Sequence, residues 1–145
     1  MNSREINELF ENTKQFKGVY PRDGLNFKLN KYTGCIINTD RHNEPGEHWV
    51  AVYMGDIPIY FDSFGLPPMF DEFVNFLDNQ SPIGWLHNTI PFQSIYQDTC
   101  GMHCLFFLTC MFKYNDFNIF MNIFNKSKHE NDILAKILYK TIKDV

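Results

Sequence analysis

The chain has 145 residues and a formal net charge of −4. This length fits one domain, so we expect a single domain over residues 1–145. No run of Lys and Arg occurs, and the sequence therefore gives no electrostatic case for nucleic acid or an anionic membrane. No stretch of about 18 apolar residues occurs either, so no transmembrane helix and no membrane partner are expected. The N-terminus is polar and lacks the apolar core of a secretion signal, which predicts an intracellular protein.

The cysteines are spaced poorly for a disulfide framework or a structural zinc site. Cys100 and Cys104 lie one helical turn apart, Cys110 follows in the same apolar segment, and no Cys-x-x-Cys pair occurs. We therefore expect no bound metal and a reducing compartment.

Hydrophobic periodicity predicts strands in the middle of the chain and helices at both ends. Expected strands cover residues 35–37, 49–53, 59–61 and 89–92. Expected helices cover residues 3–16, 70–77, 100–113, 115–125 and 129–143, with Ser3 as the first N-cap. Residues 18–34 carry turn signals and are expected to be irregular. This order predicts an α+β fold in which the apolar helix from Cys100 is buried against the sheet.

Cys100 and Gly101 stand where the most apolar helix is expected to begin. Unpaired N–H groups and the positive end of the helix dipole favour a thiolate at such a position. Gly101 allows a substrate carbonyl to approach the backbone closely. The position alone fits a buried, inert Cys equally well, because free Cys is often buried.

His48 and Asp62 flank a predicted hairpin around Gly55. If residues 54–56 form a three-residue loop, His48 faces Asp62 directly and the pair can act as a base and its orienting acid. A two-residue loop would instead pair His48 with Ser63 and place Asp62 on the other face. The hairpin therefore leaves the pairing open, and a surface His at a strand end is the alternative.

A neutral amide donor for an oxyanion is available upstream of Cys100. Gln93 lies seven residues before it and Gln97 three residues before it. A Gln side chain suits this role, but spacing does not choose between the two.

In this order, the residues resemble those of the adenovirus protease (adenain), within the broader adenain/Ulp1-like cysteine peptidases. The resemblance covers residues 18–113. It is carried by Ile37-Asn38-Thr39, Arg41, Gly46, His48-Trp49, the stretch from Tyr60 to Gly65, and Gln93 with six residues before Cys100-Gly101-x-x-Cys104. Asp62 stands where adenain carries Glu. Residues after 113 carry no match.

The resemblance implies a cysteine endopeptidase on a small central mixed or antiparallel sheet. Cys100 would be the nucleophile, His48 its base, Asp62 the orienting acid and Gln93 the oxyanion donor, with Gly101 supporting the oxyanion hole. Trp49 would pack beside the imidazole and contact substrate. The function implied is maturation of viral or virus-like structural precursors at Gly-containing sites. Removal of ubiquitin-like modifiers, as by Ulp1-like members, and a catalytically silent binding module of the same fold are the alternatives.

No cofactor is required by the sequence, but the resemblance implies an activating viral peptide or DNA. Residues 36–99 contain no Cys, so a disulfide-linked activator cannot attach in that stretch. The localisation implied is the host nucleus or cytoplasm, or the virion.

Other His and Cys residues are assigned no catalytic role. His103 shares the helix of Cys100 but has no evident orienting acid, and the remaining His are expected in loops or solvent: His42, His87 and His129. Cys35, Cys104 and Cys110 are expected to be small core groups.

Overall fold

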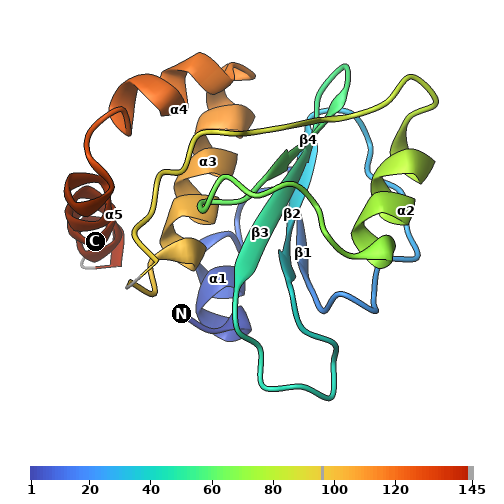
Figure 1. Cartoon of the computed structure of the whole chain (residues 1–145), viewed down its shortest axis with the longest axis horizontal. Coiled ribbons are helices and arrows are strands. Elements are labelled where there is room, and N and C mark those ends of the chain that lie inside the picture. The colour runs from blue at the N-terminus through green and yellow to red at the C-terminus, as the bar shows by residue number, and fades with distance from the viewer. Residues whose placement is uncertain (96, 144–145) are drawn as a thin grey trace.

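The computed structural model describes residues 1–95 and 97–143 and has an α+β fold, as predicted (Figure 1). The elements in chain order are α1 (Ser3–Leu9), β1 (Phe16–Tyr20), β2 (Thr33–Asn38), β3 (Trp49–Met54), β4 (Pro58–Phe61), α2 (Asp71–Gln80), β5 (Leu86–His87), α3 (Cys100–Tyr114), α4 (Phe117–Ile123) and α5 (Lys128–Lys143).

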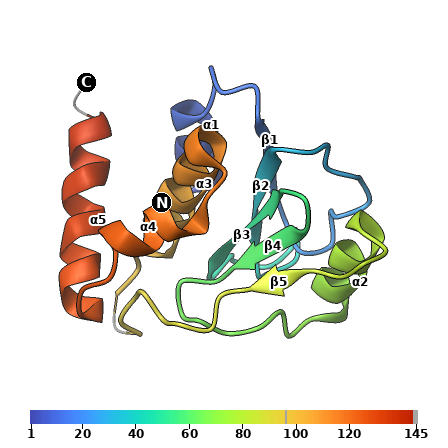
Figure 2. The ribbon, with the colours of Figure 1, turned by 90° about the horizontal axis from the view of Figure 1, so that it is seen from above.

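The five strands form one mixed sheet in the order β1-β2-β3-β4-β5. The β1–β2 and β4–β5 pairs are parallel, whereas β2–β3 and β3–β4 are antiparallel. Figure 2 shows α2 on one face of the sheet and the other helices on the opposite face.

The two faces follow from the period-2 alternation of strand residues. On β3, Ala51 and Tyr53 pack in the core beneath α3, while Val50 and Val52 pack in the core beneath α2. Both faces are covered, which explains why every residue of β2 is buried and why β3 is apolar along its whole length.

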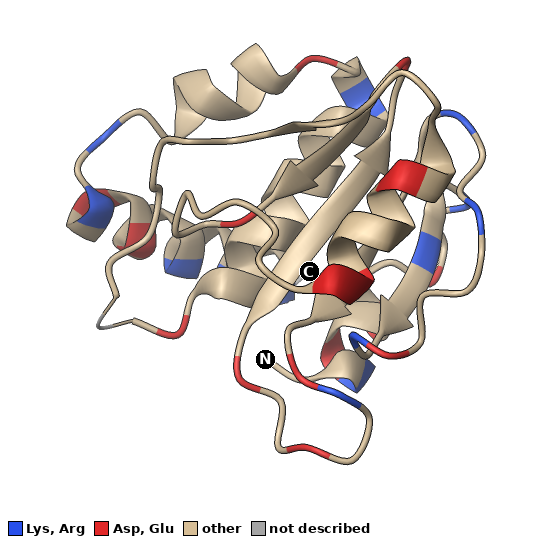
Figure 3. Ribbon diagram, turned by 45° about the vertical axis from the view of Figure 1, so that its right-hand side comes forward, with Lys and Arg blue, Asp and Glu red and all other residues tan. Residues whose placement is uncertain are grey.

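Helix α3 is the central helix of the larger core. Lys113 is the one charged residue of this helix. In the fold as a whole, Lys, Arg, Asp and Glu residues lie mainly around the periphery (Figure 3). Phe107 of α3 stacks on Phe61 of β4 with ring centroids 4.6 Å apart. Gly34 of β2 lets the helix approach, because a Cβ there would lie 2.7 Å from Leu108. The expected burial of this helix is therefore confirmed.

The N-terminal assignments were partly wrong. Helix α1 ends at Leu9 and its N-cap is Asn2, whose side chain accepts from the N–H of Glu5. Strand β1 lies across the segments expected to be helical and irregular. Gly18 has a φ of 112° and the register shifts between Phe16 and Val19, so this strand lacks a regular period.

The predicted strand over residues 89–92 was also wrong. These residues form no strand, and the edge strand is instead the two-residue β5. Strand β5 is only two residues long, which is too short for an alternating pattern to be recognised in the sequence.

The hairpin takes neither of the two registers considered. Met54 pairs with Pro58 and Ala51 with Phe61, so the loop consists of residues 55–57. Extending this pairing places His48 opposite Phe64. Asp62 lies two residues from Phe64 and hence on the same face, because side chains alternate with period 2.

No helix among the described residues is long and apolar enough to cross a membrane.

We predict that Gly34→Ala destabilises the protein by about 1–3 kcal/mol, the usual cost of overpacking a core. The added methyl would meet Leu108 and the backbone oxygen of Val52, which lies 2.9 Å from it. Gly55→Ala is the matched control, since its Cβ would meet only ordinary contacts at 3.5 Å or more. Urea unfolding measures both variants. Equal stabilities would contradict the packing of α3 on β2.

Candidate active site

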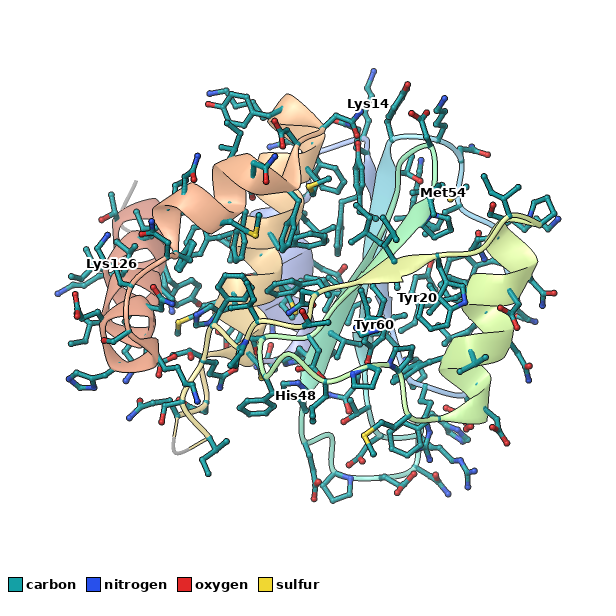
Figure 4. The ribbon with its side chains drawn as sticks, turned by 45° about the horizontal axis from the view of Figure 1, so that its top comes forward. Lys14, Tyr20, His48, Met54, Tyr60 and Lys126 are labelled. Carbon is teal, nitrogen blue, oxygen red and sulfur yellow. The ribbon has the colours of Figure 1, made fainter. Side chains whose placement is uncertain are left out.

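His48 comes just before β3, at the open end of the hairpin and far from Met54 (Figure 4). Its backbone carbonyl accepts from the N–H of Thr39, which extends the β2–β3 ladder by one residue. Its Nε2 lies 2.8 Å from Oδ1 of Asp62, and both side chains are largely buried. The ring is thus held by the sheet through its backbone and by Asp62 through its side chain.

Asp62 is fixed in turn by two residues that the sequence did not single out. Asn88 accepts from the Asp62 N–H at 2.9 Å and donates to its carbonyl at 2.7 Å. The N–H of Phe64 donates to Asp62 Oδ1, and the Phe64 ring stacks on the imidazole with centroids 4.5 Å apart. The Phe64 ring therefore covers one face of the imidazole, a contact that the sequence did not predict. A lone Asn in a loop offers no sequence signal for its role.

Cys100 opens α3 and interacts with His48. Burial raises the pKa of the Cys100 thiol, but the hydrogen bond and charge of His48, with hydrogen bonds from the backbone of Trp49 and Gly101, outweigh burial and lower it. Burial lowers the pKa of His48, but its hydrogen bonds to Asp62 and Cys100 raise it to about 9. Since Nε2 contacts Asp62, Nδ1 is the ring nitrogen left for Cys100. The pair therefore favours a thiolate beside an imidazolium.

The other cysteines have the opposite electrostatics. Burial raises the pKa of Cys35, Cys104 and Cys110, and Cys104 is also beside Cys100 and Asp62. All four cysteines are free and buried. A buried neutral thiol is a poor nucleophile, so Cys100 is the thiol that this environment activates.

Trp49 lies between the N-terminus and the first turn of α3. Its Nε1 donates to the carbonyl of Met1 at 3.0 Å, and its Cδ1 would lie 3.1 Å from a Cβ on Gly101. A cavity of about 440 Å³ adjoins this ring. Its wall includes Trp49 with Met1, Tyr20, Asn38, Asp40 and Arg41.

Gln93 is buried, and both ends of its amide are bound. Oε1 accepts from the hydroxyl of Ser63, and Nε2 donates to the carbonyl of Gln97 at 2.7 Å. The Gln93 N–H also donates to the Ser63 carbonyl, which ties this residue to the segment just after Asp62. The Gln97 side chain instead accepts from Lys136 at 2.6 Å.

The remaining histidines lie in other surroundings. His103 is buried on α3, where burial lowers its pKa and Nδ1 contacts the Thr99 carbonyl at 2.9 Å. His42 is exposed and pairs with Asp23. His87 lies in β5 instead of a loop. Within residues 1–95 and 97–143, no cluster of three or more His, Cys, Asp or Glu could hold a metal ion.

The structure thus brings His48, Asp62 and Cys100 together from β3, the end of β4 and the start of α3. A thiol with a lowered pKa, a His held by a carboxylate and the backbone N–H groups of a helix N-terminus are the kinds of group that nucleophilic acyl transfer uses.

Two solved structures of the ASFV pS273R protease resemble this chain. One matches with a TM-score of 0.61 at 17% identity, covering 92% of this chain and 65% of that one. The other, a selenomethionine form, matches with a TM-score of 0.49 at 25% identity, covering 69% of this chain and 40% of that one. This chain therefore spans less than two thirds of the protease, with which it shares its fold. No family model and no curated protein matches the sequence.

We predict that iodoacetamide alkylates Cys100 rapidly at pH values well below the ordinary thiol pKa of about 8.5. His48→Ala removes the largest contribution that lowers the Cys100 pKa and leaves burial, which raises it, opposed only by the backbone hydrogen bonds of Trp49 and Gly101. Each unit by which the pKa rises above 7 removes about tenfold of the thiolate at pH 7, so alkylation at pH 7 should slow by about tenfold for each such unit. The pH–rate profile, read by mass spectrometry, measures this. Cys104→Ala is the control and should behave as the wild type. Alkylation rates that rise only above pH ~8.5 in both the wild type and His48→Ala would contradict the ion pair.

Proposed function

We propose that the chain is a cysteine endopeptidase of adenain type with Cys100 as its nucleophile, His48 as its base, Asp62 as the orienting acid and Gln93 in the oxyanion hole. The observation that carries the proposal is the contrast among the thiols. Cys100 alone, of four buried cysteines, has a lowered pKa, and it lies against a His held by a carboxylate. The protease fold of the structural relatives supports it.

The reaction follows from this arrangement. The Cys100 thiolate attacks the peptide carbonyl carbon, and the resulting oxyanion accepts from the Cys100 N–H and the Gln93 amide, with Gly101 supporting the oxyanion hole from the first turn of α3. The His48 imidazolium gives its proton to the leaving amine as the C–N bond breaks, and a thioester remains. Neutral His48 then takes a proton from water, which attacks the thioester and releases Cys100. Asp62 keeps the ring oriented throughout.

The proposed substrates are viral or virus-like structural precursors cleaved at Gly-containing sites. We expect small substrate residues next to the cleaved bond, because the Trp49 ring and Met1 already fill the space where a Cβ on Gly101 would lie. Trp49 would contact substrate from the wall of the adjoining cavity. An activating peptide or DNA, and a role within the virion, stay predictions of the family resemblance.

We predict that Cys100→Ala abolishes peptide cleavage and leaves the fold intact, because only the thiol is removed. A library of viral-type Gly-Gly and Gly-x peptides, with peptides from the ends of ubiquitin-like modifiers, measures activity and substrate class together. Cys104→Ala is the control and should cleave, with some loss of stability. Cleavage of modifier-derived peptides alone would favour the Ulp1-like alternative, and cleavage that survives in Cys100→Ala would reject the proposal.

We predict that Gln93→Ala lowers kcat by about 10²–10³, the usual cost of losing one oxyanion donor. KM should change little, because the oxyanion develops only in the transition state. Alkylation of Cys100 should persist, since it forms no oxyanion. Gln97→Ala keeps the backbone carbonyl that Gln93 contacts and should cost less than about tenfold in kcat, within the range of a weakened positioning contact. A silent Gln93→Ala with a severe Gln97→Ala would show that the donor is the other Gln.

A further inference from the structure

Helix α5 places a buried carboxylate against the segment that leads into Cys100. Asp132 is 2% exposed. Its Oδ2 accepts from the Ser94 N–H at 3.0 Å, and its Oδ1 accepts from the Thr99 hydroxyl at 2.6 Å. These two contacts lie at the two ends of the approach segment, defined as residues 93–95 and 97–99. In Figures 1 and 2 the described part of this segment runs beside α5.

Thr99 is the N-cap of α3 but does not cap it through its side chain. An N-cap hydroxyl ordinarily accepts from an N–H in the first helical turn. Here the hydroxyl donates to Asp132 instead. The first turn of α3 is thereby left without that cap, and its Gly101 N–H interacts with the Cys100 sulfur. Because Asp132 engages the Thr99 hydroxyl, its position affects how the N–H groups of the first turn of α3 are placed around Cys100.

A second contact from α5 reaches Gln93 through Gln97. Lys136, one turn after Asp132, donates to Gln97 Oε1 at 2.6 Å. The Gln97 carbonyl accepts from Gln93 Nε2 at 2.7 Å. Lys136 is exposed, whereas Gln93 is buried. The same helix therefore holds both the oxyanion donor and the residue before the nucleophile.

Among the described residues, no Lys or Arg side chain lies within hydrogen-bond distance of the Asp132 carboxylate. His103 Nε2 lies 3.9 Å from Asp132 Oδ1, and burial lowers the pKa of His103, which favours its neutral form. Burying a carboxylate against neutral donors is costly unless its hydrogen bonds are good. An apolar residue at this position could pack against the core but could not accept from Ser94 and Thr99.

We propose that Asp132 is a positioning residue for the peptidase reaction, holding the approach segment so that Gln93 and the first turn of α3 can stabilise the oxyanion. This inference rests on the proposed function. It assigns a role to the C-terminal helix, which carries no part of the family resemblance.

The test separates oxyanion stabilisation from thiol activation. Asp132→Ala should lower kcat about 10–100-fold with KM nearly unchanged, because part of one oxyanion donor's contribution is lost. The rate at which iodoacetamide alkylates Cys100 should stay within about threefold of the wild-type rate, since this reaction depends on His48 but on no oxyanion hole. Asp132→Asn keeps one acceptor oxygen and should recover part of kcat. Amide hydrogen exchange at Ser94 and residues 97–99 should rise while exchange in β3 stays unchanged.

Lys136→Met supplies a surface variant that does not threaten folding. It removes the hydrogen bond to Gln97 and should lower kcat several-fold, again with alkylation preserved. Lys140→Met, at an exposed Lys one turn further along α5, is the matched control and should match the wild type.

Two results would overturn the inference. One is a wild-type kcat in Asp132→Ala. The other is a loss of hydrolysis and alkylation by the same factor, which a general structural role would produce. A wild type that cleaves no peptide while Asp132→Ala still loosens the approach segment would reject the proposed function instead, because hydrogen exchange reports the contacts of Asp132 without any substrate.

Discussion

The packing of helix α3 across strand β3 is the constraint on which the candidate site depends. The Cys104 thiol donates to the Trp49 carbonyl at 3.4 Å, and Gly101 lies close to the Trp49 ring. Cys100 is one turn before Cys104, so these contacts also fix its place beside His48. A strand rises about 3.3 Å per residue, so a shift of α3 by one residue along β3 would separate the thiol from the imidazole. The packing of α3 on β3 therefore keeps Cys100 beside His48.

The sequence predicted the central elements because their patterns are local. The apolar runs of β3, β4 and α3 and the ends of those runs place His48, Asp62 and Cys100 without any knowledge of packing. The pairing of His48 with Asp62 was predicted from the wrong register, yet the two lie together because a two-residue slip preserves the face of the sheet. Strand β1 could not be predicted, since Gly18 and its register shift interrupt the alternation.

The supports of the site could not be predicted because they are tertiary. Asn88 binds the backbone of Asp62 from a loop 26 residues away, and Asp132 binds Thr99 from 33 residues away. Neither spacing forms a motif. In the pattern of α5, Asp132 is one charged residue among several of both signs (Figure 3), and only the fold places it in the core. The residues that perform the proposed chemistry are thus near the ends of recognisable elements, while those that hold them are scattered.

Attack of Cys100, paired with His48, on a peptide carbonyl is the step on which the proposed function depends. Its most direct test is to treat the protein at neutral pH with a peptide electrophile that ends in Gly and to locate the adduct by mass spectrometry. The account predicts one adduct, on Cys100, which is lost in His48→Ala. An adduct on Cys104 or Cys35 with Cys100 unmodified, or the same labelling without His48, would contradict it.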